Sequence, residues 1–398
     1  MWRHLKPPTL LCTTDYATNT GFAWTYIEGV YARVADALAT RGIRTLVAYP
    51  RIVDAPETLA GSAAEAVEWD TSMKGPRGIF ELARRVRAEN VRVFYGADRP
   101  VWHPGYLALH AAGCGRVIVH AHVPGNANAP TGLRRLAKWS LVRLPLVSSD
   151  LVLAVSDFVA RRQIAAGQMP PDRVVRIYNG VRTAAERPSR PASSTATQPF
   201  PEVRPIIGCS CRCSPEKGVA HLLRAFERLM QGWSGDRPRP VLLYIGDGPA
   251  MGDVRALREA SLWKNDIRLA GYHANPASLL ADADICVVPS LCQEGFGLAA
   301  AEPMALGISV IASRVGALPE LIEDGVTGRL VPPGDEEALA RVLRELLEAP
   351  EMRRRLGAAA REHVARELSI ERTLSQLVPL LESPFREQAG AETTTALS

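Results

Sequence analysis

Short apolar segments alternate with longer amphipathic segments along most of this chain. Residues 9–12 (TLLC) and 45–50 (TLVAYP) are apolar runs between polar loops, which is typical of strands buried on both faces of a parallel sheet. Between them, residues 24–42 carry apolar side chains at helical spacing and end at Gly42. This strand–helix–strand order predicts an α/β fold.

The same alternation returns in the second half and is clearest from residue 284 to residue 313. An apolar run (DICVVPS) is followed by a loop, then by a helical segment (LAAAEPMAL), and then by a second apolar run (SVIAS). Gly307 is well placed to end the helical segment as its C′ residue. This segment therefore predicts two buried parallel strands joined by a helix, with a loop at the carboxyl end of the first strand.

A segment rich in Pro, Ser, Ala and Thr separates the two halves. Such a composition predicts a linker rather than a packed element. We therefore expect a first domain at residues 1–183, a linker at 184–202 and a second domain at 203–367. A last helical stretch follows at 368–383, and we expect the polar tail at 384–398 to be disordered.

The overall composition narrows the possible functions. The chain has 398 residues, of which 47% are hydrophobic, and a formal net charge of +5. This charge does not require a nucleic-acid partner, and it is compatible with an anionic donor or an anionic membrane surface. The seven scattered cysteines and the lack of a signal-like apolar segment indicate a cytoplasmic protein. No apolar run approaches the roughly 18 residues of a membrane-spanning helix.

One basic amphipathic segment suggests peripheral contact with the inner face of a membrane. In residues 131–146 (TGLRRLAKWSLVRLPL), four cationic side chains lie apart from the leucines on a helical projection. Such a helix can bind anionic lipid. The alternative is an ordinary helix with a solvated basic face.

The loop from residue 294 to residue 297 has the composition of a phosphate-binding turn. Gly295, Phe296 and Gly297 let the backbone approach a ligand, and free N–H groups at the following helix start attract phosphate. Glu294 and Glu302 flank this turn, and a carboxylate is suited to accept hydrogen bonds from sugar hydroxyls. The segment thus offers donors for a diphosphate and acceptors for two sugar rings.

Two cations precede a predicted helix near the start of the second domain. Arg212 follows an apolar strand, and Lys217 stands just before the helix that begins near Val219. Both can meet a diphosphate that the helix amides already favour. Two solvated surface cations would be the alternative explanation.

The pattern Glu-x7-Glu around Gly-Phe-Gly resembles the signature of retaining nucleotide-sugar glycosyltransferases with two Rossmann-like domains (the GT-B type), specifically glycosyltransferase family 4. The resemblance implies two doubly wound α/β domains that face each other across a cleft. The first would bind the acceptor, the second would bind the donor, and the C-terminal helix would cross back to the first. The chain departs from the usual family pattern at Pro303 and Ala317, where alanine and glycine are more common.

The resemblance also implies roles for individual residues. Glu294, with Gly295 and Phe296, would orient the donor sugar, and Glu302 would bind the ribose. Arg212 and Lys217 would bind the diphosphate, and the loop holding Tyr272 would hold the base.

Three further positions are less distinctive. A histidine of the family contacts the transferred sugar; His122 is our choice, with His120 as the alternative. Gly21 stands where the family has a glycine-rich turn, although an ordinary helix start explains it equally well. Gly246 would form a tight turn against the nucleotide.

The predicted activity is transfer of a glycosyl group from a nucleoside diphosphate sugar to an acceptor hydroxyl, in glycan, polysaccharide or glycolipid biosynthesis. We expect neither a cofactor nor a metal, and we interpret Asp282-Ala283-Asp284 as a helix end. The alternatives are an epimerase or phosphorylase on a similar scaffold and a non-catalytic nucleotide-sugar binding protein. The base, the sugar, the acceptor and the oligomeric state stay open.

Overall fold

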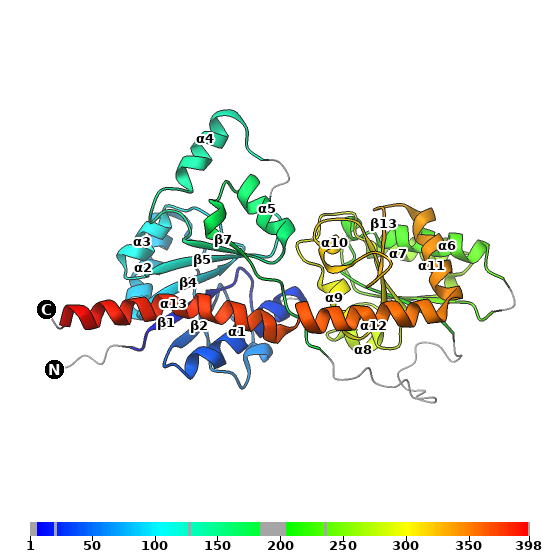
Figure 1. Ribbon diagram of the computed structural model, residues 1–398, viewed down its shortest axis with the longest axis horizontal. Helices are drawn as coiled ribbons and strands as arrows, with labels where there is room; N and C mark the ends of the chain where they lie inside the picture. The colour runs from blue at the N-terminus through cyan, green and yellow to red at the C-terminus, as the bar shows by residue number, and fades with distance from the viewer. Residues whose placement is uncertain (1–5, 20–21, 126–128, 184–203, 235–236, 397–398) are drawn as a thin grey trace. The chain divides into compact units, whose positions relative to one another are not determined.

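A computed structural model of the protein describes residues 6–19, 22–125, 129–183, 204–234 and 237–396 (Figure 1). The chain divides into two compact units. The first contains residues 1–178 together with 373–398, and the second contains residues 179–372. The expected linker at 184–202 and the expected turn at Gly21 lie outside the described residues.

The first unit is built on a seven-stranded parallel sheet with the order β3-β2-β1-β4-β5-β6-β7. Its strands are β1 (Thr9–Thr13), β2 (Arg44–Tyr49), β3 (Ala64–Glu68), β4 (Val91–Ala97), β5 (Arg116–Ala121), β6 (Leu151–Ala154) and β7 (Val174–Arg176). The sequence pattern did not reveal β3, because this edge strand is half-exposed and carries two glutamates in five residues. The strand order reverses between β1 and β4, which is where open α/β sheets bind ligands.

Helices connect the strands of this sheet. They are α1 (Phe22–Ala39), α2 (Gly75–Ala88), α3 (Gly105–Ala111), α4 (Gly132–Leu141) and α5 (Asp157–Ala165), with 3₁₀ turns η1 (Glu57–Leu59) and η2 (Pro171–Arg173). Ser156 caps α5 by accepting a hydrogen bond from the Val159 N–H group. Phe94 and Tyr106 are fully buried in the core on one face of the sheet.

The C-terminal helix α13 (Ile370–Ala396) packs on the first unit from residue 373 onward. The Arg41 guanidinium lies 2.5 Å from the Glu382 carboxylate, and Leu377, Leu381 and Phe385 are buried. We expected a disordered tail from residue 384, but the structure continues the helix to Ala396. The apolar face contributes to this difference up to Phe385, which extends the four-residue spacing of the two leucines past residue 383.

The second unit contains a six-stranded parallel sheet with the order β10-β9-β8-β11-β12-β13. Its strands are β8 (Ile206–Ser210), β9 (Val241–Ile245), β10 (Ile267–Leu269), β11 (Ile285–Val288), β12 (Ser309–Ser313) and β13 (Arg329–Val331). Its helices are α6 (Val219–Gln231), α7 (Met251–Ala260), α8 (Pro276–Leu280), α9 (Leu298–Ala305), α10 (Leu318–Leu321), α11 (Glu336–Glu348) and α12 (Pro350–Glu367), with 3₁₀ turns η3 (Pro215–Lys217) and η4 (Lys264–Asp266). Two parallel-sheet α/β units confirm the predicted fold class.

The strand order of the second unit reverses between β8 and β11. Because all six strands are parallel, their following loops meet at one edge of the sheet, and the reversal opens a crevice between them. No helix within the described ranges has the length and the apolar character needed to cross a bilayer.

Candidate active site

Loops at the carboxyl edge of the second sheet carry most of the residues that the sequence singles out in this unit, and Glu302 lies in the helix that follows one of them. Main-chain hydrogen bonds hold these loops together. The Leu291 N–H group donates to the Glu216 carbonyl at 2.8 Å, which joins the loop after β11 to the loop after β8. The Gly246 N–H group donates to the Gly271 carbonyl, also at 2.8 Å, which joins the loops after β9 and β10. The structure thus brings the predicted turns together at the expected edge.

Lys217 and Glu294 form the closest contact between predicted site residues. The Lys217 Nζ lies 2.6 Å from the Glu294 Oε1, although the residues are 77 positions apart in sequence. Ser290 donates its hydroxyl to the same oxygen at 2.5 Å. Both charged side chains are largely buried, with 25% and 16% of their surfaces exposed.

The electrostatics of this pair keep the lysine charged. Partial burial lowers the pKa of Lys217, but the charge of Glu294 and its hydrogen bond outweigh that effect, so the net pKa lies above its usual value. A permanent cation therefore lies next to a carboxylate at the start of two helices, α6 and α9. The amides of a helix start favour an anion at the same place.

Close backbone packing fixes the position of Glu294. Gly316 has a φ of +56°, and a β-carbon added to it would lie 2.2 Å from the Glu294 carbonyl oxygen. The Ala317 N–H group donates to that carbonyl at 3.0 Å, and the Gly316 N–H group donates to the Gln293 side chain at 2.8 Å. Ala317 has a φ of −84°, so the second glycine common in the family is not needed here.

The turn before α9 buries the Phe296 ring. Gly297 caps the helix with a φ of +108°, and the Phe296 side chain is only 4% exposed. Gly295 is buried as well. Any contribution of these residues to donor binding would therefore come from the main chain.

Glu302 lies about one turn inside α9 and is half-buried. Burial raises the pKa of its carboxyl group to about 7. Within the described part of the chain, no side chain or amide donates a hydrogen bond to it. Such a carboxylate retains its full capacity to accept hydrogen bonds from a ligand.

Arg212 and Tyr272 are more exposed members of the set. The Arg212 side chain forms no ion pair with any described residue, and it leaves the loop after β8 into solvent. The Tyr272 side chain is 62% exposed and follows Gly271 in the loop after β10. Both residues lie at the same edge of the sheet as the ion pair.

The predicted histidines belong to the first unit, at the carboxyl end of β5. His120 is buried inside the strand, and its Nδ1 lies 2.6 Å from the Tyr95 hydroxyl. Burial, followed by the charge of His122, lowers the pKa of His120 well below its usual value. The His122 ring is half-buried and lies 4.2 Å from the His120 ring, centroid to centroid. His122 is thus the histidine of this pair that a ligand can reach.

Asp98 positions the backbone of His122. Its Oδ1 accepts the N–H groups of His122 at 2.7 Å and Val123 at 3.0 Å. Burial lowers the pKa of His122, and the Asp98 carboxylate opposes that shift. The imidazole is therefore neutral near pH 7 and can donate or accept one hydrogen bond.

Sequence reasoning missed Ser290, Gln293 and Asp98. Each of them follows an apolar strand, which was the available signal, because polar residues after parallel strands gather at the ligand-binding edge. The sequence did not show that their partners are Glu294, Gly316 and His122.

The fold and this arrangement of charged groups define a class of protein: a nucleotide-sugar glycosyltransferase of the two-domain GT-B type. Comparisons with known proteins agree. Residues 27–185 match the family model "Glycosyltransferase Family 4", and residues 193–363 match the model "Glycosyl transferases group 1". The chain belongs to glycosyltransferase family 4, and it is an enzyme that transfers a sugar from a nucleotide-sugar donor.

Individual proteins support the same assignment. The chain is 28% identical to a GDP-mannose-dependent monoacylated alpha-(1-6)-phosphatidylinositol monomannoside mannosyltransferase of Corynebacterium glutamicum, over 95% of this chain and 98% of the relative. It is 26% identical to a related mannosyltransferase of Mycolicibacterium smegmatis, over 88% and 92%. A glycosyltransferase of Rickettsia africae superposes with a TM-score of 0.78 at 22% identity, over 96% and 99%.

Proposed function

We propose that the chain transfers a hexosyl group, with retention of configuration, from a nucleoside diphosphate hexose to a hydroxyl of a membrane-borne acceptor. The Lys217–Glu294 contact of 2.6 Å is the observation that carries this proposal. In the donor, a single bridging oxygen joins the hexose to the β-phosphate. A site for both must therefore hold a phosphate-binding cation and a sugar-binding carboxylate side by side.

The other residues extend this site along the donor. Arg212, Lys217 and the amides before α6 and α9 would stabilise the charge that develops on the leaving diphosphate. Glu294 would orient the hexose hydroxyls, and Glu302 would accept hydrogen bonds from the ribose. Tyr272 and Gly246 would border the base.

Front-face displacement accounts for retention with these residues. The acceptor oxygen forms its bond to the anomeric carbon as the bond to the diphosphate breaks, and the electron pair leaves with the diphosphate. The acceptor proton passes to a diphosphate oxygen on the same face. His122 would orient the reacting hydroxyl, and the mechanism requires no metal and no cofactor.

The names of the two relatives suggest a particular donor and acceptor. Both relatives are GDP-mannose-dependent and act on phosphatidylinositol monomannosides. GDP-mannose is therefore the donor that we propose to test first, with a phosphoglycolipid as acceptor. We also propose that the enzyme works in the cytoplasm and binds peripherally to the inner face of the membrane.

Labelled GDP-mannose tests this function. Label should move into the organic phase when phosphatidylinositol monomannoside is supplied, and the product should keep the α-configuration. Glu294→Ala should abolish the transfer without lowering the thermal unfolding midpoint by more than a few degrees. Glu362→Ala, which removes an exposed carboxylate on α12, is the matched control and should transfer normally. Wild-type rates in Glu294→Ala would contradict the proposed site.

A parallel screen separates the donor from the reaction class. Thermal shifts with GDP-mannose and with UDP-glucose identify the preferred nucleotide, because a ligand that binds the native state stabilises it. Tight donor binding without transfer to any acceptor would indicate a binding protein instead.

A further inference from the structure

Helix α4 of the first unit carries large apolar side chains that the described chain leaves exposed. Leu133 is 85% exposed, Leu136 is 60% exposed and Trp139 is 46% exposed. No residue of the helix is buried. Figure 1 shows α4 standing away from the sheet of the first unit. An amphipathic helix normally turns its apolar side toward a core, so this side requires another partner.

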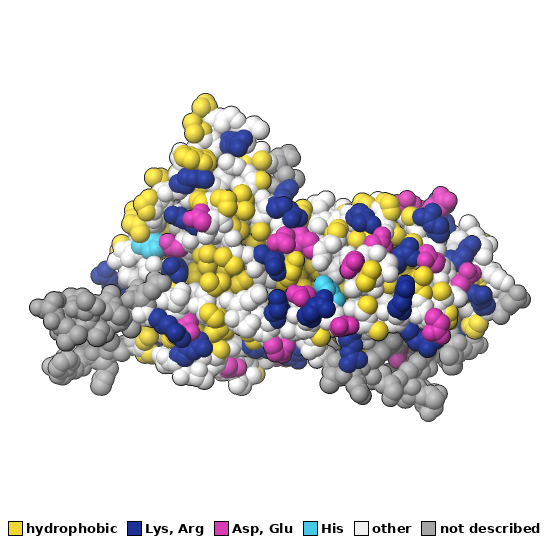
Figure 2. Space-filling view, in the orientation of Figure 1, with side chains coloured by type: hydrophobic (Ala, Val, Ile, Leu, Met, Phe, Trp, Pro, Cys, Tyr) yellow, Lys and Arg dark blue, Asp and Glu magenta, His cyan; other side chains and the backbone are white. Residues whose placement is uncertain are grey.

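The positive charge around α4 favours an anionic partner for this exposed face. Residues 123–149 contain four cationic side chains and no acidic one. Figure 2 shows hydrophobic and basic side chains close together on the projection formed by this part of the first unit. The Arg143 guanidinium lies 4.2 Å from the centre of the Trp139 ring, so a positive charge lies directly beside an apolar side chain of α4.

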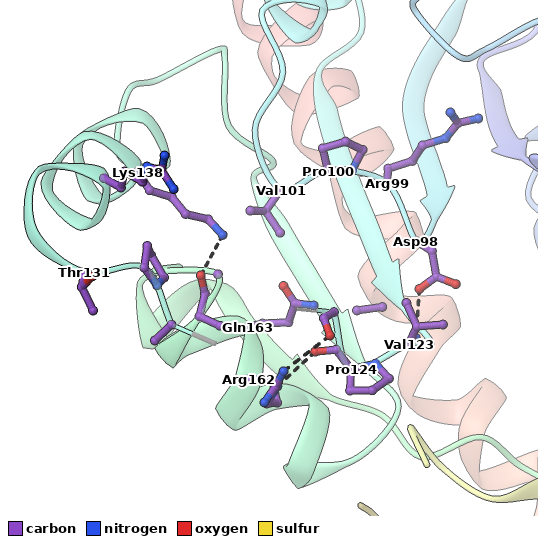
Figure 3. A pocket seen from close by; sticks show the side chains of 17 residues that line it. Asp98, Arg99, Pro100, Val101, Val123, Pro124, Thr131, Lys138, Arg162 and Gln163 are labelled. Atoms are coloured by element: carbon purple, nitrogen blue, oxygen red, sulfur yellow. Dashed lines mark hydrogen bonds between the residues drawn. The ribbon is translucent and has the colours of Figure 1, made fainter. Parts of the chain in front are cut away.

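A cavity of about 540 Å³ lies beneath α4, between that helix, α5 and the loop after β5. Arg134 and Lys138 line it from α4, and Arg162 lines it from α5. Figure 3 shows the Lys138 side chain extending across to the Ala166 carbonyl, where its Nζ donates at 2.7 Å. Cavities of this size hold small ligands or head groups.

The other charges that line the cavity do not cancel this positive set. The Arg99 guanidinium pairs with Asp15 at 2.8 Å and points away from Lys138 in Figure 3. One oxygen of Asp98, Oδ1, accepts the N–H groups of His122 and Val123. The single negative charge of Asp98 is outnumbered by the three cations that line the cavity from α4 and α5. Lys138 is partly desolvated, which lowers its pKa and makes an anionic partner more favourable. The cavity is therefore suited to a phosphate.

The cavity also adjoins the backbone on both sides of His122. Ala121 and Val123, the two sequence neighbours of His122, form part of its wall. A molecule whose phosphate lies against Lys138 can therefore present a hydroxyl next to His122.

We propose that this cavity holds the phosphate-bearing head group of an anionic membrane lipid, while Leu133, Leu136 and Trp139 enter the lipid interface. Helix α4 contributes to both parts, because its cations line the cavity and its leucines face outward. The inference rests on the proposed function, since it gives the acceptor a chemical class, but binding to the lipid does not require a donor.

Vesicle co-sedimentation of the full chain tests the proposal. The wild type should bind vesicles of phosphatidylcholine mixed with phosphatidylglycerol and should bind phosphatidylcholine alone much more weakly. Lys138→Gln removes a cavity cation, and Arg135→Gln removes a cation on the same helix that does not line the cavity. A basic residue near an anionic surface contributes about fivefold to binding, so Arg135→Gln should lose about that factor and Lys138→Gln clearly more. Equal losses in the two variants would overturn the cavity assignment.

The apolar contact needs its own variant and control. The double variant Leu133→Ser, Leu136→Ser should reduce vesicle binding at least tenfold. Leu262→Ser changes an equally exposed leucine of the second unit (89% exposed) and should have no effect. Unchanged binding of the double variant would overturn the membrane contact. A dimer in solution that the double variant dissociates would assign this face to a second copy of the chain and would also overturn the proposal.

Inorganic phosphate at constant ionic strength distinguishes a lipid from a free anion. Phosphate alone should raise the unfolding midpoint much less than anionic vesicles do, whereas an equal rise would identify a soluble ligand and overturn the lipid source. A separate donor thermal shift on the wild type keeps the two proposals apart. Absence of vesicle binding with intact donor binding would remove only the lipid proposal. Absence of donor binding would instead remove the proposed function.

Discussion

The raised pKa of Glu302 leads to a quantitative prediction about donor binding. Its carboxyl titrates with a pKa of about 7, because α9 and its surroundings bury it without a hydrogen-bond donor among the described residues. Accepting hydrogen bonds from both ribose hydroxyls requires the ionised form. Donor affinity should therefore fall as the pH drops below about 7.

The size of this effect follows from the pKa. Near pH 8 the carboxyl is about nine-tenths ionised, whereas near pH 6 only about one molecule in ten carries the charge. The dissociation constant of a nucleotide sugar should therefore rise about tenfold between these two conditions. Glu302→Gln should bind weakly at both, with a nearly flat pH profile.

The same raised pKa predicts that stability changes with pH in the opposite direction to donor affinity. In the unfolded chain a glutamate titrates near its usual pKa of 4.5, so the native state binds the extra proton between pH 4.5 and about 7. The wild type should therefore gain stability as the pH falls through this window. Above it, the native state carries a poorly solvated charge, and Glu302→Gln should be more stable by about 1–3 kcal/mol.

Isothermal titration with a nucleotide sugar measures the first effect, since the diphosphate diester does not titrate in this range. Denaturant unfolding at the same pH values measures the second. Glu362→Gln is the control and should follow the wild type in both experiments. A wild-type affinity that does not change between about pH 6 and 8, or a Glu302→Gln variant that keeps the full pH dependence, would refute the reasoning.

Three further tests address other parts of the site. Arg212→Ala should weaken donor binding roughly tenfold to a hundredfold, because it removes a charged hydrogen bond to phosphate. Gly316→Ala should destabilise the second unit by about 1–3 kcal/mol or more, because the added β-carbon would clash with the Glu294 carbonyl oxygen. Gly325 is the control: it has a similar φ of +79°, but no atom lies near the position of an added β-carbon, so Gly325→Ala should lower stability less. His122→Ala should lower transfer with little loss of stability, whereas His120→Ala should lower stability, because the buried Tyr95 hydroxyl loses its partner.

Each of these tests has a defined contrary result. Arg341→Ala, an exposed cation on α11, should leave donor affinity unchanged, and equal losses in both arginine variants would remove Arg212 from the site. Equal unfolding midpoints for the two glycine variants would show that the close approach to Glu294 is unimportant. Full transfer by His122→Ala would exclude it from the reaction.

The sequence by itself determined the fold class and singled out the candidate residues of the site. Buried parallel strands are read from apolar runs, helices from their spacing, and phosphate-binding turns from glycine and cations next to a helix start. These are local properties, and they located Glu294, Glu302, Arg212 and Lys217. The local pattern failed at β3, where a half-exposed edge strand lacks an apolar run.

Only the tertiary structure decided how distant residues meet. Lys217 reaches Glu294 across 77 positions because β8 pairs with β11, and no local periodicity encodes this pairing. Burial of the Glu302 carboxyl, burial of the Phe296 ring and exposure of the α4 leucines also depend on which elements pack together. Burial and strand pairing depend on contacts between residues that are far apart in the chain. These contacts raise the pKa of Glu302, and they leave the leucines of α4 exposed.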